Sequence, residues 1–462
     1  MRIPIKTLRT PPTTTLPSTQ ANTLLKPRCI ATTQPSKPAN TNTLHLSNDT
    51  RQAALHLEKM INLEDYNNNY NFPAMQPSSS SSSRTLGLKA EKLGKRWKEY
   101  QGMSNWEGLL DPLDDNLRAE ILRYGHFVEA AYESFEFDPS SPNYANCRFP
   151  KNTLFERCGL PNTGYKVTKH LRATSGIQLP SWVEKAPSWV ATQSSYVGYV
   201  AVCDNKEEIK RLGRRDVVVA YRGTTTCLEW LENFRATLTN LRIPCTTKRA
   251  FEKNIEGSEA MVESGFLSLY TSSLSANSSL MSLQDMIREE ISRIFETYSG
   301  EPLSLTVTGH SLGAALATLT AFDLKTVFPK LPVTVISFGG PRVGDRSFRR
   351  KLESQGTKVL RIVNSDDVIT KVPGFVFDDN VASGEGVHVA AFPSWIQKRV
   401  EEAQWVYAEV GKELRLSSRD SPYLGNRNVA TCHELNTYLH LVDGFVSSTC
   451  PFRASAKRFL RG

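Results

Sequence analysis

No stretch of the 462-residue sequence approaches the run of about 18 consecutive apolar residues that marks a membrane-spanning helix. This absence excludes a transmembrane segment. The N-terminus also lacks the continuous apolar segment of a secretory signal peptide. Any contact with a membrane or a lipid-droplet surface is therefore expected to be peripheral.

The eight cysteines form no Cys-x-x-Cys pair, and no histidine stands beside them at zinc-ligand spacing. They are Cys29, Cys147, Cys158, Cys203, Cys227, Cys245, Cys432 and Cys450. The sequence thus predicts no metal and no other cofactor. We expect mostly reduced thiols, with room for one or two disulfides. Because Cys432 precedes His433, a thiol nucleophile at this position is one alternative.

Acidic residues are missing from the first 48 positions, which contain six basic ones. The whole chain has a formal charge of +9, so residues 49–462 together carry only +3. This small surplus is a weak argument for a nucleic-acid partner. The first 48 residues are also rich in Ser, Thr, Pro and Asn, a composition typical of an organellar transit peptide. An ordinary disordered tail is the alternative.

The composition changes after the serine-rich run at 77–83. We expect residues 1–85 to be a transit peptide and a disordered Ser/Thr/Pro-rich linker, because they cannot bury enough apolar surface to fold. Residues 86–462 are expected to form one domain, in which 86–150 is a helical N-terminal layer. No internal repeat is present.

The middle of the chain alternates short β-branched runs with longer helical stretches, which predicts an α/β fold with a mostly parallel sheet covered by helices. Expected strands are 197–203, 216–221, 303–308, 333–338 and 358–364. Expected helices are 282–299, 312–327 and 345–354. Residues 395–416 are ambiguous, and we expect a helix followed by a strand pair that turns at Gly411.

One pentapeptide, Gly309-His-Ser311-Leu-Gly313, lies between a β-rich run and a small-residue helical stretch. A strand followed by a sharp turn and a helix is the setting of a nucleophile elbow, which exposes the serine hydroxyl above the sheet. Glycine is needed on both sides of the serine because a side chain there would collide with the neighbouring strand and helix. The pattern favours Ser311 as a nucleophile over an ordinary glycine-rich turn.

A serine hydroxyl needs a base, and the base needs an acid partner. The elbow architecture places them in the chain order Ser, acid, His. The histidines downstream of Ser311 are His388, His433 and His440, and spacing alone does not separate the last two. The candidate acids are Asp345, Asp366 and Asp367, of which Asp345 could instead cap the following helix.

Several motifs together resemble the class 3 lipases, and more closely the chloroplast-targeted class of plant phospholipase A1 enzymes. The resemblance covers roughly residues 97–452. Its motifs are Tyr221-Arg-Gly-Thr224, Gly265-Phe266, Gly309-His-Ser-Leu-Gly313, Phe338-Gly-Gly-Pro-Arg-Val-Gly344, Asn364-Ser-Asp-Asp-Val368 with Val372-Pro373, and Cys432-His-Glu-Leu-Asn-Thr-Tyr-Leu-His440-Leu-Val-Asp-Gly444. The fold that it implies is the α/β-hydrolase fold with a lid, here within 227–243.

The resemblance also implies site roles that spacing leaves open. It gives Asp367 as the acid and His433 as the base, and it leaves His440 as a packing residue. Leu312, through its backbone N–H, and Thr224 would form the oxyanion hole.

The function implied by the resemblance is hydrolysis of the sn-1 ester of polar glycerolipids in the plastid. The substrate would be phosphatidylcholine, galactolipids or both, and the released fatty acid could supply oxylipin or jasmonate synthesis. We expect a lipid partner, with the protein associated with a membrane or plastoglobule surface, and no nucleic acid. The alternatives are a triacylglycerol or monoacylglycerol lipase and a non-catalytic lipase-like signalling protein.

Overall fold

The computed structural model describes residues 93–138, 140–174, 194–223, 238–241, 259–273, 281–371, 406–424 and 429–451. Several sequence expectations lie outside these ranges. They concern the leader and linker 1–85, Thr224, His388 and most of the expected lid, of which only 238–241 are described.

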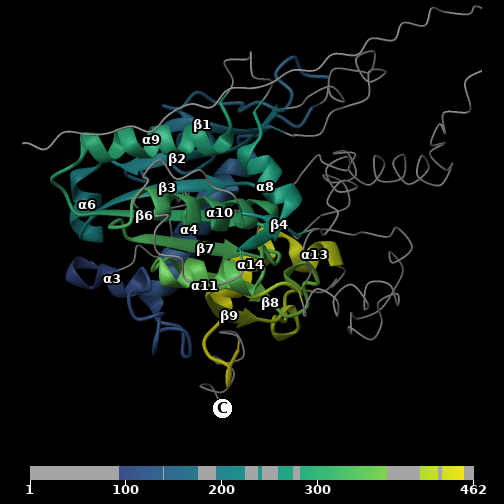
Figure 1. The fold of residues 1–462 in the computed structure, drawn as a ribbon. Helices are drawn as coiled ribbons and strands as arrows, with labels where there is room; N and C mark the ends of the chain where they lie inside the picture. Colours follow the sequence, from purple (N-terminus) through teal and green to yellow (C-terminus); the bar gives the residue numbers. More distant parts are fainter. Residues whose placement is uncertain are drawn as a thin grey trace, which may run out of the picture. The chain divides into compact units, whose positions relative to one another are not determined.

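A seven-stranded sheet forms the centre of the described fold (Figure 1), in the order β1-β2-β3-β6-β7-β8-β9. Its strands are β1 (Tyr165–Thr174), β2 (Ser194–Cys203), β3 (Arg215–Tyr221), β6 (Leu303–His310), β7 (Val333–Phe338), β8 (Lys358–Asn364) and β9 (Lys412–Leu416). β1, β2 and β3 pair antiparallel, and every pair from β3 to β9 is parallel. This confirms the predicted mostly parallel α/β fold, and all five expected strands are present. A small second sheet pairs β4 (Leu238–Asn240) with β5 (Met261–Glu263).

Helices cover both faces of the large sheet, which explains why its central strands β3, β6 and β7 are buried along almost their whole length. Alternate residues of β3 enter different cores: Val218 and Ala220 pack on one side, and Val217, Val219 and Tyr221 on the other. The first core includes α3 (Trp97–Tyr100), α4 (Asp115–Glu133) and α14 (Leu435–Gly444). The second includes α8 (Ser264–Thr271), α9 (Leu283–Thr297), α10 (Leu312–Val327) and α11 (Arg346–Ser354).

Short helical segments complete the described architecture. They are η1 (Gly94–Arg96), α5 (Leu154–Arg157), α6 (Lys206–Leu212), η4 (Ile369–Lys371), η7 (Ser418–Asp420) and α13 (Val429–His433). None of the helices in the described ranges has the length and apolar content needed to cross a membrane.

The strand expected after Gly411 is present as β9, but the expected pairing of two strands across Gly411 is wrong. Gly411 does bend the chain, with φ +77°, but the segments on its two sides do not pair with each other. Ala408 forms an isolated bridge with Gly344, whereas β9 extends the large sheet by pairing in parallel with β8. The helix expected from 395 falls mostly outside the described residues.

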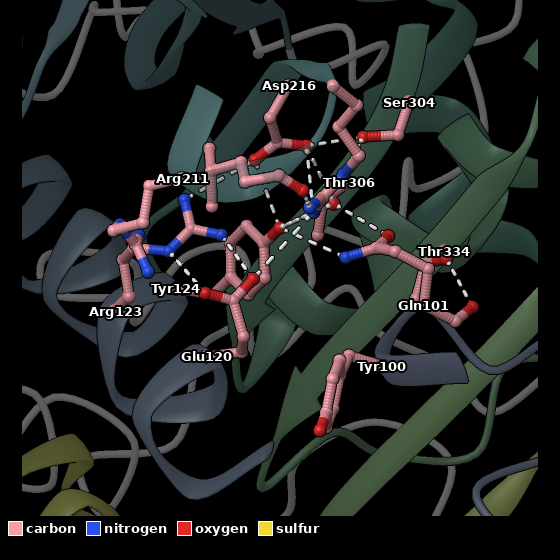
Figure 2. A network of polar contacts seen from close by, with 12 residues as sticks. Tyr100, Gln101, Glu120, Arg123, Tyr124, Arg211, Asp216, Ser304, Thr306 and Thr334 are labelled. Carbon is pink, nitrogen blue, oxygen red and sulfur yellow. Dashed lines mark hydrogen bonds and ion pairs between the residues drawn. The ribbon is translucent and has the colours of Figure 1, made fainter. Parts of the chain in front are cut away.

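A buried polar network joins α4 to the start of β3 and β6 (Figure 2). The Asp216 carboxylate accepts hydrogen bonds from Ser304 Oγ at 2.8 Å and from Tyr124 Oη at 3.0 Å. It also lies 3.4 Å from the Arg123 guanidinium and 3.7 Å from that of Arg214. Burial would raise the pKa of Asp216, but the two arginines, together with hydrogen bonds from Ser304 and Tyr165, hold the pKa below its usual value. The network fixes α4 against the sheet by satisfying charges that would otherwise be costly to bury.

Candidate active site

Ser311 lies at the turn between β6 and α10. Its backbone has φ +59° and ψ −125°, a strained combination for a residue with a side chain. Its N–H donates to the carbonyl oxygen of Phe338 at the end of β7, at 3.0 Å, which fixes the turn to the neighbouring strand. The strained serine after a central parallel strand is the geometry of a nucleophile elbow.

The two glycines of the elbow are required by its packing. A Cβ on Gly309 would lie 2.3 Å from the carbonyl oxygen of Gly313, and a Cβ on Gly313 would lie 2.5 Å from that of Arg222. Both contacts are with backbone atoms, so no side-chain movement could relieve them. The sequence argument for glycine at both positions agrees with these distances.

The imidazole of His433 contacts the serine. His433 ends α13, and its Nε2 lies 2.8 Å from Ser311 Oγ. Its Nδ1 lies 2.7 Å from Asp367 Oδ2. Because a carboxylate only accepts hydrogen bonds, Nδ1 carries the proton and Nε2 is free to accept one from the serine hydroxyl.

Asp367 is fully buried and lies in the turn that follows β8. Three donors converge on its carboxylate: His433 Nδ1, the N–H of Ile369 at 2.9 Å and Tyr438 Oη at 2.6 Å. Tyr438 donates here because its oxygen also accepts from the N–H of Asn364 at 3.3 Å. The carboxylate is thus fixed in place by η4, α13 and α14 together.

The other candidate acids and bases make different contacts. Asp345 caps α11, since its Oδ1 accepts from the N–H of Phe348 at 2.7 Å. Asp366 binds Ser417 Oγ at 2.9 Å and forms an ion pair with Arg419. His440 Nε2 lies 2.9 Å from Ser421 Oγ.

The thiol alternative gains no support from the contacts of the described residues. Cys432 is buried, and its carbonyl oxygen accepts a hydrogen bond from the Asn364 side chain. The imidazole of His433 meets the serine hydroxyl instead. All five cysteines in the described ranges are free thiols.

A second histidine, His310, positions His433. The sequence did not predict this role. His310 ends β6, and its Nε2 lies 2.7 Å from the carbonyl oxygen of His433, so this nitrogen carries the proton. Its Nδ1 therefore accepts from Tyr132 Oη, which lies 2.7 Å away near the end of α4. Burial, reinforced by the nearby His433, holds the pKa of His310 well below its usual value, which keeps the ring neutral, and the two hydrogen bonds set its tautomer.

The oxyanion region is described in part. Leu312 is the first residue of α10, so its N–H belongs to the helix-terminal amides that have no partner within the helix and attract negative charge. On the other side, Gly223 comes so close that an added Cβ would lie 3.0 Å from Ser311 Cβ. The next residue is the expected second donor, Thr224, which is outside the described residues.

Together these residues form a hydrogen-bonded chain from carboxylate to imidazole to hydroxyl beside a helix N-terminus. Such an arrangement can deprotonate the serine and stabilise an oxyanion on the group that it attacks. It is suited to acyl transfer from an ester.

Comparisons with known proteins match this chemistry. A family model described as lipase (class 3) matches residues 218–377. The chain is 68% identical over 372 residues to phospholipase A(1) DAD1, chloroplastic, of Arabidopsis thaliana, covering 80% of this chain and 81% of that protein. It is 38% identical to phospholipase A1-Igamma1, chloroplastic, covering 77% and 68%, and 39% identical to galactolipase DONGLE, chloroplastic, covering 76% and 70%, both of the same plant.

Proposed function

The chain belongs to the class 3 lipase family, and on that premise we propose that it hydrolyses the sn-1 ester of polar glycerolipids and releases a free fatty acid. The observation that carries the proposal is the continuous contact from Asp367 through His433 to Ser311, with hydrogen-bond distances of 2.7 and 2.8 Å. We assign Ser311 as nucleophile, His433 as base and Asp367 as the acid that orients the base.

In the first half-reaction, Ser311 Oγ attacks the ester carbonyl while His433 Nε2 takes the hydroxyl proton. The Leu312 N–H, and Thr224 as second donor, hold the oxyanion that forms. When the tetrahedral intermediate collapses, the imidazolium gives its proton to the departing glycerol oxygen. The lysolipid leaves, and the fatty acyl group remains bonded to the serine.

In the second half-reaction, His433 deprotonates a water molecule that attacks the acyl-enzyme carbonyl. Collapse of this intermediate breaks the bond to Ser311 Oγ, which regains a proton from the imidazolium. The fatty acid is released, and the enzyme returns to its starting state. Asp367 stabilises the imidazolium in both halves without being protonated itself.

The substrate class rests on similarity to the relatives. Their names state phospholipase A1 and galactolipase activities, which supports phosphatidylcholine, galactolipids or both as substrates. The same names state a chloroplast location, which agrees with the acid-free N-terminal segment of this chain and supports a plastid protein. Contact with the lipid surface would be peripheral.

Labelling with a fluorophosphonate probe tests the nucleophile. The wild type should be labelled and Ser311→Ala should not, whereas Cys432→Ser serves as the matched control and should label normally. Labelling of Ser311→Ala to the wild-type level would refute the assignment.

Product analysis tests the substrate class and the position of cleavage. Phosphatidylcholine and monogalactosyldiacylglycerol with different acyl chains at sn-1 and sn-2 should release mainly the sn-1 acid. A strong preference for triacylglycerol or monoacylglycerol in parallel assays would instead support the neutral-lipid alternative.

A further inference from the structure

An open pocket of about 760 Å³ lies beside α11, and arginines dominate its lining. The described lining residues are Arg342, Arg346, Arg349, Arg350, Tyr407, Ala408 and Glu409. Four arginines against one glutamate give this lining a formal charge of +3. None of these residues belongs to the Ser311, His433 and Asp367 constellation.

Three of the arginines share one face of α11. Arg346, Arg349 and Arg350 occupy positions i, i+3 and i+4, so their side chains are neighbours on the helix surface. Arg349 is paired with Glu353 at 3.0 Å, whereas Arg346 forms no ion pair with any described residue. Like charges at this spacing destabilise a helix, and a bound anion would relieve the repulsion.

The fourth arginine is buried and incompletely paired. The side chain of Arg342 binds Glu409 at 2.8 Å, but its Nε is buried without a hydrogen-bond partner in the described structure. Glu409 also lies 3.8 Å from Arg361, whose nearer carboxylate is Glu413 at 3.5 Å, so Glu409 is shared by two guanidinium groups. The hydroxyl of Tyr407 is a second buried group of the lining that lacks a partner among the described residues.

We propose that this pocket binds a phosphate group, carried by a lipid head group or by a soluble phosphate ester. Guanidinium groups match phosphate in shape and bind it with two hydrogen bonds each. Because Glu353 neutralises Arg349, the lining keeps a surplus of two positive charges, which fits a phosphate monoester, with about two negative charges, better than a carboxylate with one. The volume is within the usual range of about 300–1,000 Å³ for small-ligand sites, so it admits a ligand larger than the phosphate ion alone.

Binding is tested on the full chain carrying Ser311→Ala, which prevents hydrolysis of the lipid probe. One arm measures co-sedimentation with phosphatidylcholine vesicles that do or do not contain phosphatidic acid. The other arm measures calorimetric binding of glycerol 3-phosphate. Binding to the phosphatidic acid vesicles alone assigns the site to a lipid head group, and binding of glycerol 3-phosphate assigns it to a soluble ester.

The decisive variant is Arg346→Gln, since this side chain is exposed and its loss should leave folding intact. We expect roughly fivefold weaker binding, and a larger loss when Arg350→Gln is added. Lys351→Gln is the matched control, because it removes the same charge from an exposed position of the same helix that does not line the pocket. The proposal is overturned if neither probe binds, or if Arg346→Gln and Lys351→Gln weaken binding equally.

Discussion

Replacing Asp367 by asparagine removes the negative charge of the proposed acid while keeping its shape. The carboxylate accepts from three donors, on His433, Ile369 and Tyr438. An amide has a single oxygen, so it cannot accept from all three. If its oxygen faces Ile369, its NH₂ group forces His433 into the tautomer that cannot accept the proton of Ser311. If it is flipped, its NH₂ group opposes the N–H of Ile369.

The magnitude follows from these two arrangements. In the first, the base has the wrong tautomer, and in the second the imidazolium loses its negative partner. Either should lower kcat by about four powers of ten, which is the usual size for such a change and corresponds to roughly 5 kcal/mol. Each arrangement also leaves a buried donor unpaired, so the free energy of unfolding should fall by about 1–3 kcal/mol.

The assay is the kcat for a soluble nitrophenyl ester, measured well below the unfolding temperature of the variant. Asp366→Asn is the matched control, because this neighbour contacts Ser417 and Arg419 and not His433. We expect it to keep kcat within about threefold of the wild type. An Asp367→Asn enzyme with kcat within tenfold of the wild type would refute the assigned role, as would equal losses in both variants.

Three further predictions concern groups around the sheet. Tyr132→Phe removes the donor to His310, so we expect roughly tenfold lower kcat with unchanged KM for the soluble ester; an unchanged kcat would contradict the positioning role. Asp216→Asn removes one of the two carboxylates beside the buried Arg214, so that Glu120 alone remains at 3.7 Å, and should lower the free energy of urea unfolding by about 3 kcal/mol; a loss below 1 kcal/mol would contradict it. Burial raises the pKa of Glu263 from 4.5 to about 7, so the wild type should lose up to roughly 3 kcal/mol of stability as pH rises through this window. Glu263→Gln should abolish that loss in urea unfolding at pH 5 and pH 8, and an equal loss in both proteins would exclude this carboxyl as its source.

The central strands and the elbow were predictable because each is specified by a local pattern. The bounds of β7, β8 and α10 agree with the sequence prediction to the residue. These strands are buried on both faces, so they appear as short β-branched runs that end at polar or glycine residues. The glycines at 309 and 313 follow from the steric demands of a single turn.

Edge strand β1 was not predicted, and edge strand β9 was expected only with the wrong partner; charge is the physical reason. β1 contains Lys166, Lys169 and Arg172, and β9 contains Lys412, Glu413 and Arg415. Such side chains protect a sheet edge from pairing with other chains, but they also hide the apolar alternation from which a strand is inferred. The same weak signal near Gly411 produced the wrong strand pair.

Sequence spacing alone could not decide which aspartate is the acid or which histidine is the base. Asp366 and Asp367 are adjacent, and only the turn after β8 determines which side chain faces α13. The support from Tyr132 to His310 joins positions 178 residues apart, with no local pattern to indicate it. The family resemblance identified the residues of the proposed triad, whereas their supporting contacts required the three-dimensional structure.

The buried network and the proposed catalytic residues lie at opposite ends of the same strands. Ser304 binds Asp216 near the start of β6, and Ser311 follows its last residue, so roughly 20 Å of strand separates them. Substitutions at such distances and without shared partners usually act independently. The effect of Asp216→Asn should therefore be confined to stability, with kcat unchanged at temperatures where the variant is folded. A parallel loss of kcat in the folded variant would mean that the network also positions the elbow, through the rigid strand between them.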